Sequence, residues 1–166
     1  MHWCDRKSAN AAIIQFIITI WRGTKAIIRS CPHWAVDVSS KTRKEVGAIG
    51  EKVAAEYLKR HGFRIRDRNV ARKTGELDII AESEDTLHFV EVKTILTDEF
   101  PDEKYFGDEY DPSLNLHEMK IRKVARTGEW YVLEKDWEGE WQVDGILVWL
   151  RRRDGIAKVR YLPQIV

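Results

Sequence analysis

Two apolar segments separated by four polar residues constrain the fold of this chain more than any other feature. The segments are GELDIIAE, residues 75–82, and LHFVEVKT, residues 87–94, and SEDT lies between them. Segments of this length that are rich in Ile, Val and Phe, with so short a connection, predict an antiparallel β-hairpin. A two-residue turn at Glu84 and Asp85 would fix which residues face each other across the hairpin.

The predicted hairpin brings charged side chains together. With that turn, Asp78 lies opposite Glu91, and Glu76 lies opposite Lys93. Directly opposed residues share a face, and alternation along the strand places Glu91 and Lys93 on that same face. A solvated face of paired charges is one interpretation of this pattern, and a functional site is the other.

The two opposed carboxylates favour a bound cation, because their charges would otherwise repel each other. Carboxylate oxygens suit Mg²⁺ (or Mn²⁺), and substrate phosphates can complete the shell of the ion. A bound ion lowers the pKa of a water molecule and stabilises charge on a phosphate. Lys93 would stabilise the pentavalent phosphate rather than act as a general base. The hairpin therefore predicts a metal site for phosphodiester hydrolysis, with Asp78 and Glu91 as ligands.

The segment before the hairpin predicts a helix that carries a third acid. Residues 44–62, KEVGAIGEKVAAEYLKRHG, have helical apolar periodicity, and Gly62 is expected to end the helix. Glu51 lies at the margin of the apolar face. Gly47 and Gly50 are unfavourable inside a helix, so we expect them where the helix closely approaches another backbone.

The remaining segments complete a layered pattern. A strand is expected at 63–70, a second helix at 115–135, and two strands at 141–150 and 156–166, joined by an Asp-Gly turn. The order is therefore helix, three strands, helix, two strands. This order predicts an α/β fold with a mixed sheet and helices packed on its faces.

Basic and acidic residues are segregated along the chain, although the formal net charge is only +1. Residues 59–73, 120–126 and 151–153 are basic, whereas residues 97–111 are dominated by carboxylates. Each basic run alone is typical of a solvated face. Three such runs in one small domain favour a polyanionic partner.

The N-terminal part of the chain allows several interpretations. A chain of 166 residues suits one compact domain, which we place at residues 41–166, after an extension at residues 1–40. Residues 11–21, AAIIQFIITIW, are apolar but too few to span a bilayer, which takes about 20 residues. The alternatives are a packed or dispensable helix, a secretion signal or membrane-surface helix, and a misassigned start codon. Cys4 and Cys31 form no CxxC pair, so we expect no zinc site and a cytoplasmic location.

Several of these stretches resemble known nucleases. An upstream helical Glu, an Asp and a later Glu-x-Lys resemble the PD-(D/E)XK superfamily. The stretches GAIGEKVAAEYLKRHGFRI, GELDIIA, LHFVEVKT and KIRKVA are similar to the YraN-type uncharacterised bacterial family, which is related to archaeal Holliday-junction resolvases. The resemblance covers residues 44–166. It implies a restriction-endonuclease-like three-layer fold, with a central mixed sheet of about five strands flanked by helices.

The resemblance also implies roles for individual residues. Asp78 and Glu91 would be metal ligands, with Glu51, the acid of the helix, as a third ligand, and Lys93 would be the catalytic lysine. Glu76 matches the Gly-Glu-hydrophobic-Asp motif of the family and is an accessory candidate.

Further candidates lie outside the hairpin. Lys120 and Lys123 match basic positions of the family and, with Arg68 of the first basic run, are the candidate nucleic-acid-binding residues. Asp144 is either an accessory site residue or a buried strand Asp with satisfied hydrogen bonds. The chain departs from the family at Ile95, where the family usually has Arg. It also departs in QVDG and NVAR, which replace Arg-Phe-Asp-Val and an Asn-x-Arg.

These features lead to two hypotheses of function. The first is a Mg²⁺-dependent endonuclease that hydrolyses phosphodiester bonds in DNA, such as branched or repair intermediates. The second is a nucleic-acid-binding or adaptor protein with little or no turnover, which the departures favour because they remove phosphate contacts. Membrane association through residues 11–21 is compatible with either hypothesis. A homodimer would suit a two-fold substrate.

Overall fold

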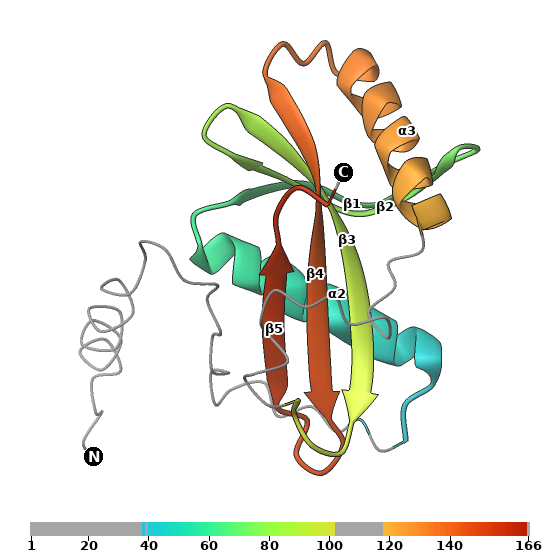
Figure 1. Ribbon diagram of the computed structural model, residues 1–166, viewed down its shortest axis with the longest axis vertical. Helices are drawn as coiled ribbons and strands as arrows, with labels where there is room; N and C mark the ends of the chain where they lie inside the picture. Colours follow the sequence, from blue (N-terminus) through green and yellow to red (C-terminus); the bar gives the residue numbers. More distant parts are fainter. Residues whose placement is uncertain (1–37, 39, 102–117, 166) are drawn as a thin grey trace, which may run out of the picture.

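The computed structural model describes residues 38, 40–101 and 118–165 of the chain. Its elements are α2 (Arg43–Arg60), β1 (Arg64–Arg72), β2 (Gly75–Ser83), β3 (Thr86–Thr97), α3 (Glu118–Glu134), β4 (Glu140–Arg151) and β5 (Ala157–Leu162). Their order confirms the expected succession of helix, three strands, helix and two strands (Figure 1). The apolar run at 11–21, both cysteines and the acidic residues 102–111 lie outside the described residues.

Local interactions define both ends of α2. The Thr42 hydroxyl accepts a hydrogen bond from the N–H of Glu45 at 3.3 Å, and the Glu45 carboxylate accepts one from the N–H of Thr42 at 2.8 Å. This reciprocal pair is a capping box. At the other end, Gly62 has a φ of 87°, which glycine adopts without strain, so the expected helix stop is confirmed.

The five strands form one mixed sheet in the order β1-β2-β3-β4-β5. The pairs β1–β2, β2–β3 and β4–β5 are antiparallel, whereas β3 and β4 are parallel over their whole lengths. Parallel neighbours require a crossover connection, and α3 belongs to it. Among the helices that the structure describes, neither is long and apolar enough to cross a membrane.

The β2–β3 hairpin has the predicted register near its turn but not at its open end. Ser83 pairs with Thr86 and Ile79 pairs with Val90, which is the register that a turn at Glu84 and Asp85 requires. Glu84 adopts a φ of 55°, in the region that glycine would otherwise favour. The pairing ends at Ile79 and Val90. The prediction that the next pair in the ladder is Asp78 with Glu91 is therefore wrong.

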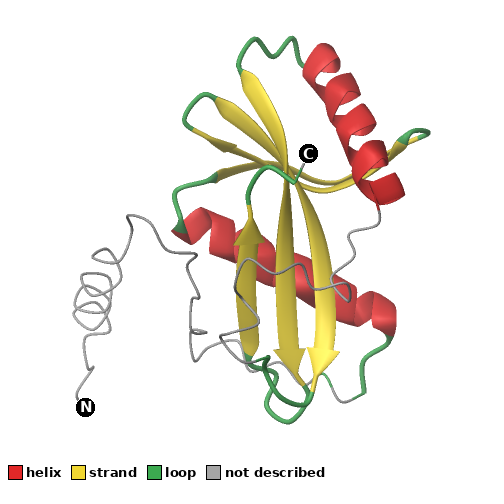
Figure 2. Ribbon diagram, viewed as in Figure 1, coloured by secondary structure: helices red, strands yellow, loops and turns green. Residues whose placement is uncertain are grey.

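Two apolar clusters lie on opposite faces of the sheet, which makes three layers (Figure 2). Val90 and Val92 of β3 face α2, whereas Leu87 and Phe89 face α3, as strand alternation predicts. The α2 side contains Val46, Val53, Ala54, Leu58, Ile79, Val90, Val92, Ile146, Val148 and Leu150. The α3 side contains Leu77, Ile80, Leu87, Phe89, Val124, Tyr131 and Val143.

Strand β2 departs from regular alternation near the candidate acids. Leu77 and Ile80 are separated by an odd number of positions, yet both pack in the cluster under α3. The expected common face for Glu76, Asp78 and Ile80 is therefore interrupted between Leu77 and Ile80. Hence the pattern of the sequence alone does not fix where Asp78 points.

Helix α2 approaches β3 closely at one glycine. A Cβ atom on Gly50 would lie 1.8 Å from the side-chain oxygen of Thr94, so no larger residue fits there without movement. The expected close approach occurs at Gly50, but to the side chain of Thr94 and not to another backbone, and the expectation is wrong for Gly47, whose added Cβ would meet nothing within 4 Å. The contact fixes the spacing between α2 and β3 beside Glu51 and Lys93.

Candidate functional site

Glu91 lies on β3 just beyond the last paired residues of the hairpin and is only 1% exposed. One of its carboxylate oxygens, Oε1, accepts a hydrogen bond and ion pair from the ammonium group of Lys120 in the first turn of α3. Within the described residues, the other oxygen, Oε2, is the one buried side-chain oxygen or nitrogen that lacks a hydrogen-bond partner. Native proteins satisfy most buried polar atoms, so this oxygen is the candidate ligand atom of the site.

The surroundings of Glu91 and Lys120 shift the titration of both groups. Burial raises the pKa of Glu91 to about 7, the charge of Asp78 adds to this effect, and Lys120 and Lys93 oppose it. Burial alone would lower the pKa of Lys120, but its hydrogen bond to Glu91 and the charges of Glu91, Asp78 and Glu76 raise it overall. The Lys120 ammonium thus lies in the field of three carboxylates.

Asp78 closes the open end of the hairpin through its side chain. Its carboxylate accepts a hydrogen bond from the backbone N–H of Val92 at 2.8 Å, beyond the last paired residues of β2 and β3. This bond holds Asp78 beside β3, where its charge acts on Glu91. Asp78 and Glu91 therefore lie near each other as predicted, although a side-chain bond and not ladder pairing brings them together.

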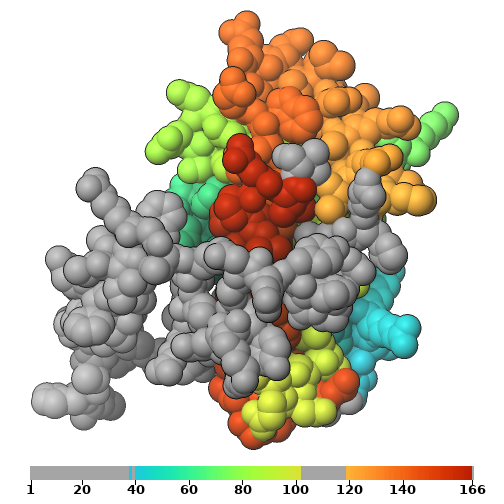
Figure 3. Space-filling view, viewed as in Figure 1, coloured from blue at the N-terminus to red at the C-terminus, as the bar shows by residue number. Residues whose placement is uncertain are grey.

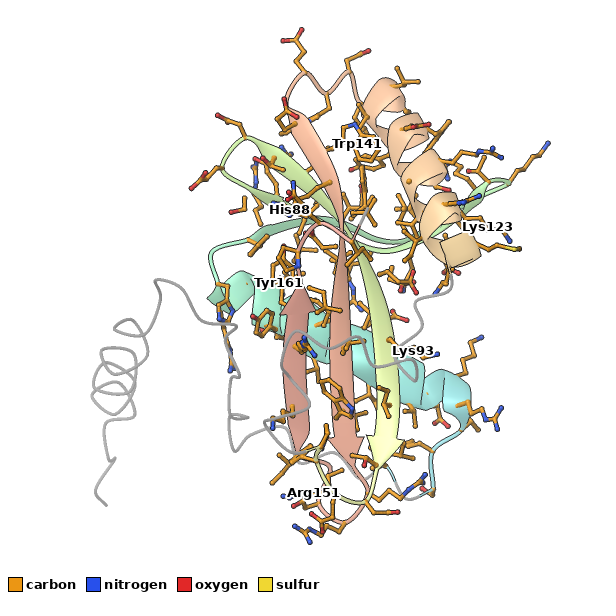
Figure 4. All side chains as sticks on the ribbon, in the orientation of Figure 1. His88, Lys93, Lys123, Trp141, Arg151 and Tyr161 are labelled. Carbon is orange, nitrogen blue, oxygen red and sulfur yellow. The ribbon has the colours of Figure 1, made fainter. Side chains whose placement is uncertain are left out.

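Lys93 follows Glu91 by two positions on β3 and is exposed. Figure 4 labels Lys93 on β3 and Lys123 at the end of α3 that is drawn nearer to it. Its charge acts on Glu91. An exposed cation next to a buried carboxylate can contact a ligand that reaches the carboxylate from solvent.

Glu51 contacts a basic residue of β1. Its carboxylate lies 3.6 Å from the guanidinium of Arg68, and both side chains are partly exposed. Arg68 also lines a surface hollow of about 420 Å³ between α2 and β1, together with Lys52 and Lys59. In the described parts of the chain, no group of three or more His, Cys, Asp or Glu side chains is arranged to hold a metal ion. A site with Glu51 as third ligand is therefore not assembled in this structure.

The other predicted basic residues lie on α3 near the tip of the β1–β2 hairpin. Lys123 is exposed, and a Cβ on Gly75 would lie 3.2 Å from the Cβ of Lys123. The hydroxyl groups of Thr74 and Thr127 are hydrogen-bonded at 2.9 Å and join the tip to the helix. Glu76 is exposed beside them. The structure thus places Lys123 next to the hairpin tip, whereas Lys120 contacts Glu91.

Asp144 of β4 is completely buried, and four groups surround its carboxylate. The Tyr161 hydroxyl and Nδ1 of His88 each lie 2.6 Å from Oδ2, while the Gln142 amide at 2.7 Å and the N–H of Gln164 at 2.9 Å donate to Oδ1. Burial would raise the pKa of Asp144, but these hydrogen bonds lower it overall. This is the satisfied strand Asp that was one of the two interpretations of the sequence.

The partners of Asp144 were not found from the sequence. His88 and Tyr161 lie together in Figure 4, and the C-terminal residues, red in Figure 3, lie at the surface beside α3. Phe63 packs edge-on against both the His88 and Tyr161 rings, with centroids 4.9 and 5.9 Å away. The spacing of Gln142 and Asp144 on one strand face was the one available signal. The other partners come from β3, from β5 and from the residues that follow β5.

The architecture defines the fold class of this protein. The mixed sheet between α2 and α3 is the restriction-endonuclease-like α/β fold that the sequence predicts. The model of the family described as "Uncharacterised protein family UPF0102" matches residues 50–153. The chain therefore belongs to this family, the YraN-type family that its motifs resemble.

Individual relatives agree with this assignment. The chain is 37% identical over 102 residues to a UPF0102 protein of Campylobacter fetus subsp. fetus, which covers 61% of this chain and 81% of that protein. It is 33% identical over 103 residues to a UPF0102 protein of a Nitratiruptor species, covering 62% and 81%. Among solved structures, Pyrococcus furiosus SfsA in complex with Ca²⁺ matches 87% of this chain and 75% of that chain, with 17% identity and a TM-score of 0.35.

Proposed function

We propose that this protein is a divalent-metal-dependent endonuclease that hydrolyses phosphodiester bonds in DNA. The observation that carries the proposal is the carboxylate of Glu91, which is buried with one unpartnered oxygen beside Asp78 and two lysines. A buried carboxylate is stabilised by protonation or by a nearby cation, and a divalent ion at the unpartnered oxygen would supply such a cation. DNA is the proposed substrate because exposed basic residues surround the acids.

The donor set fits Mg²⁺ or Mn²⁺. Oε2 of Glu91 and the carboxylate of Asp78 are hard oxygen donors, and few protein ligands suffice when water and phosphate oxygens complete the shell. Bound there, the ion would supply a water molecule of lowered pKa and would stabilise charge on the phosphate.

The residues of the chain would take separate roles in this reaction. The N–H of Val92 orients the Asp78 carboxylate, and burial fixes the position of Glu91. Lys93, exposed beside them, would donate hydrogen bonds to the phosphate oxygens and stabilise the negative charge that develops. This role makes Lys93 a charge-stabilising group rather than a general base.

Basic residues on two elements would position the DNA. The tip of the β1–β2 hairpin and the exposed face of α3 are joined by the Thr74–Thr127 hydrogen bond and by Arg72, which stacks 3.9 Å from the ring centroid of Trp130. The exposed basic residues there are Arg72, Lys73, Arg122, Lys123 and Arg126. Phosphate contacts of this kind fix orientation and register without specifying sequence. Branched DNA and repair intermediates are the substrates that we propose to test first.

A second candidate function is nucleic-acid binding without turnover. The ion pair between Lys120 and Glu91 favours it, because a cation from the protein itself already neutralises the carboxylate. The Glu51–Arg68 contact favours it as well, since it engages the proposed helix acid elsewhere.

One assay separates these functions. Purified protein is incubated with linear, flap and four-way DNA in Mg²⁺ or Mn²⁺, alongside Asp78→Ala and Lys93→Ala. We expect metal-dependent cleavage that Asp78→Ala abolishes and Lys93→Ala lowers by roughly 100-fold or more, since one charge-stabilising group is typically worth that much. The matched control is Lys135→Ala, whose ammonium lies near the Tyr131 ring and Glu134 at the far end of α3.

The outcomes distinguish the hypotheses. Cleavage lost in both site variants and retained in Lys135→Ala supports the endonuclease. DNA binding without cleavage of any substrate in either metal would replace it with the adaptor function. Cleavage that survives in Asp78→Ala would contradict the proposed metal site.

A further inference from the structure

Lys120 provides the charge that neutralises the buried acid. Its ammonium pairs with Oε1 of Glu91, while Asp78 and Glu76 lie near enough for their charges to act on it. A divalent ion bound between Glu91 and Asp78 would need the same negative field. The ammonium and the ion are therefore competitors for one carboxylate.

The position of Lys120 is unfavourable for its own helix. It lies in the first turn of α3, where the partial positive charge of the helix end disfavours a cation. Helix stability therefore gives no reason for a lysine here, whereas the pairing with Glu91 does.

The two partners differ in their freedom to move. The Glu91 side chain is 2% exposed and cannot leave its place without disturbing the sheet, whereas the Lys120 side chain is 53% exposed. A lysine has a flexible stem and a strongly hydrated head, so this head can move into water once another cation neutralises Glu91. The ion pair can thus open on the lysine side alone.

We propose that Lys120 is a displaceable internal cation, which neutralises Glu91 in the metal-free protein and leaves it when a divalent ion binds. The inference rests on the proposed metal site and adds a positioning residue to it. The released ammonium remains on the same turn of α3, where it can meet a phosphate of the DNA. Lys120 therefore lowers the affinity for metal in the absence of substrate and adds a phosphate contact in its presence.

The competition has a measurable size. If Lys120 pairs with Glu91 in about nine of ten metal-free molecules, only the remaining tenth can bind metal directly, and the apparent Kd rises about tenfold. Removing the ammonium should restore this affinity. It should also leave the metal-free protein with an unpaired buried carboxylate and therefore with a lower Tm.

The test is calorimetric titration of Mn²⁺ into the full chain, without DNA, for wild type, Lys120→Met and the matched variant Lys123→Met. We expect about tenfold tighter binding by Lys120→Met and a change below about twofold for Lys123→Met, which removes an equal charge three residues further along α3, beside the hairpin tip. The Tm is measured in chelator and in excess Mn²⁺, and Lys120→Met should show the larger gain on adding Mn²⁺.

Each outcome decides a different point. Equal Mn²⁺ affinity of wild type and Lys120→Met overturns the displaceable cation while leaving the metal site intact. An equal gain of Mn²⁺ affinity in Lys120→Met and Lys123→Met has the same meaning. Absence of Mn²⁺ binding by every variant overturns the metal site itself and the proposed function with it. If Lys120→Met does not fold, Lys120→Gln provides the same comparison, because its neutral amide still donates to Glu91.

Discussion

Glu91 and Asp144 are two buried acids on neighbouring parallel strands, and they differ in how their carboxylates are hydrogen-bonded. Glu91 pairs in register with Gly145, the residue that follows Asp144, while Asp144 pairs with Val90. The two acids are 1% and 0% exposed. Asp144 has four hydrogen-bonding neighbours and a lowered pKa, whereas Glu91 has one cation, an unpartnered oxygen and a raised pKa. The difference teaches that hydrogen-bond saturation, and not burial, separates a structural acid from a candidate ligand.

The largest effect that tests this contrast is the loss of the satisfied acid. Asp144→Ala would leave several buried donors without an acceptor, so we expect a loss of about 3–5 kcal/mol in the free energy of unfolding. Urea denaturation followed by circular dichroism measures it. Asp98→Ala, which removes an 86% exposed acid, is the control and should change stability by less than about 0.5 kcal/mol. A loss of that small size for Asp144→Ala would show that the network does not stabilise the fold.

The second prediction concerns Glu91, whose replacement should raise the free energy of unfolding relative to wild type at high pH. The pKa of Glu91 is about 7 in the folded protein against an ordinary value of 4.5, so between these values the folded state binds a proton that the unfolded state lacks. The wild-type free energy of unfolding should therefore fall by roughly 3 kcal/mol as pH rises from 4.5 to 7, at 1.36 kcal/mol per pKa unit. Glu91→Gln should lack this fall.

Urea denaturation in chelator at several pH values between 5 and 8 checks this expectation. The free energy of unfolding of Glu91→Gln should rise relative to that of wild type as pH rises. Parallel plots of the two free energies against pH would contradict the raised pKa of Glu91. The lowered pKa of Asp144 acts in the other direction, since its contribution is present above the ordinary value of 3.8 and is lost only as pH falls below it.

The smallest effect separates one donor from the network. Tyr161→Phe removes the hydroxyl that donates to Asp144 at 2.6 Å and leaves the ring in place. We expect a loss of about 2 kcal/mol, the size of a hydrogen bond to a charged group. The same urea titration measures it, and Mn²⁺ affinity should stay unchanged. A weakened Mn²⁺ affinity would show that the two acids are coupled rather than independent.

The sequence predicted those parts of the fold that depend on local patterns. The hairpin register followed from alternation and from the short polar turn at Glu84 and Asp85, and the pairing of Ile79 with Val90 confirms it. The helix stop at Gly62 followed from local chemistry as well. The end of the ladder at Ile79 was not predictable, because the divergence of two strands depends on packing above and below them.

Contacts between distant elements account for the rest. Lys120 was expected to meet phosphates, but its contact with Glu91 depends on where α3 lies over the sheet. His88 reaches Asp144 only because β3 and β4 pair in parallel, across a crossover that no pattern specifies in detail. Glu51 was expected beside the other acids, yet the spacing of α2 from β1 brings it to Arg68.

The close approach of Gly50 to Thr94 has an evolutionary consequence. Any side chain at position 50 would occupy the space of the Thr94 hydroxyl, so a larger residue at 50 is tolerated only with a smaller residue at 94. The two positions should therefore change together among related sequences, and each flanks a candidate site residue, Glu51 or Lys93. An alignment of relatives in which positions 50 and 94 vary independently would contradict this coupling. This one contact is therefore expected to couple the substitutions of α2 and β3 at positions 50 and 94.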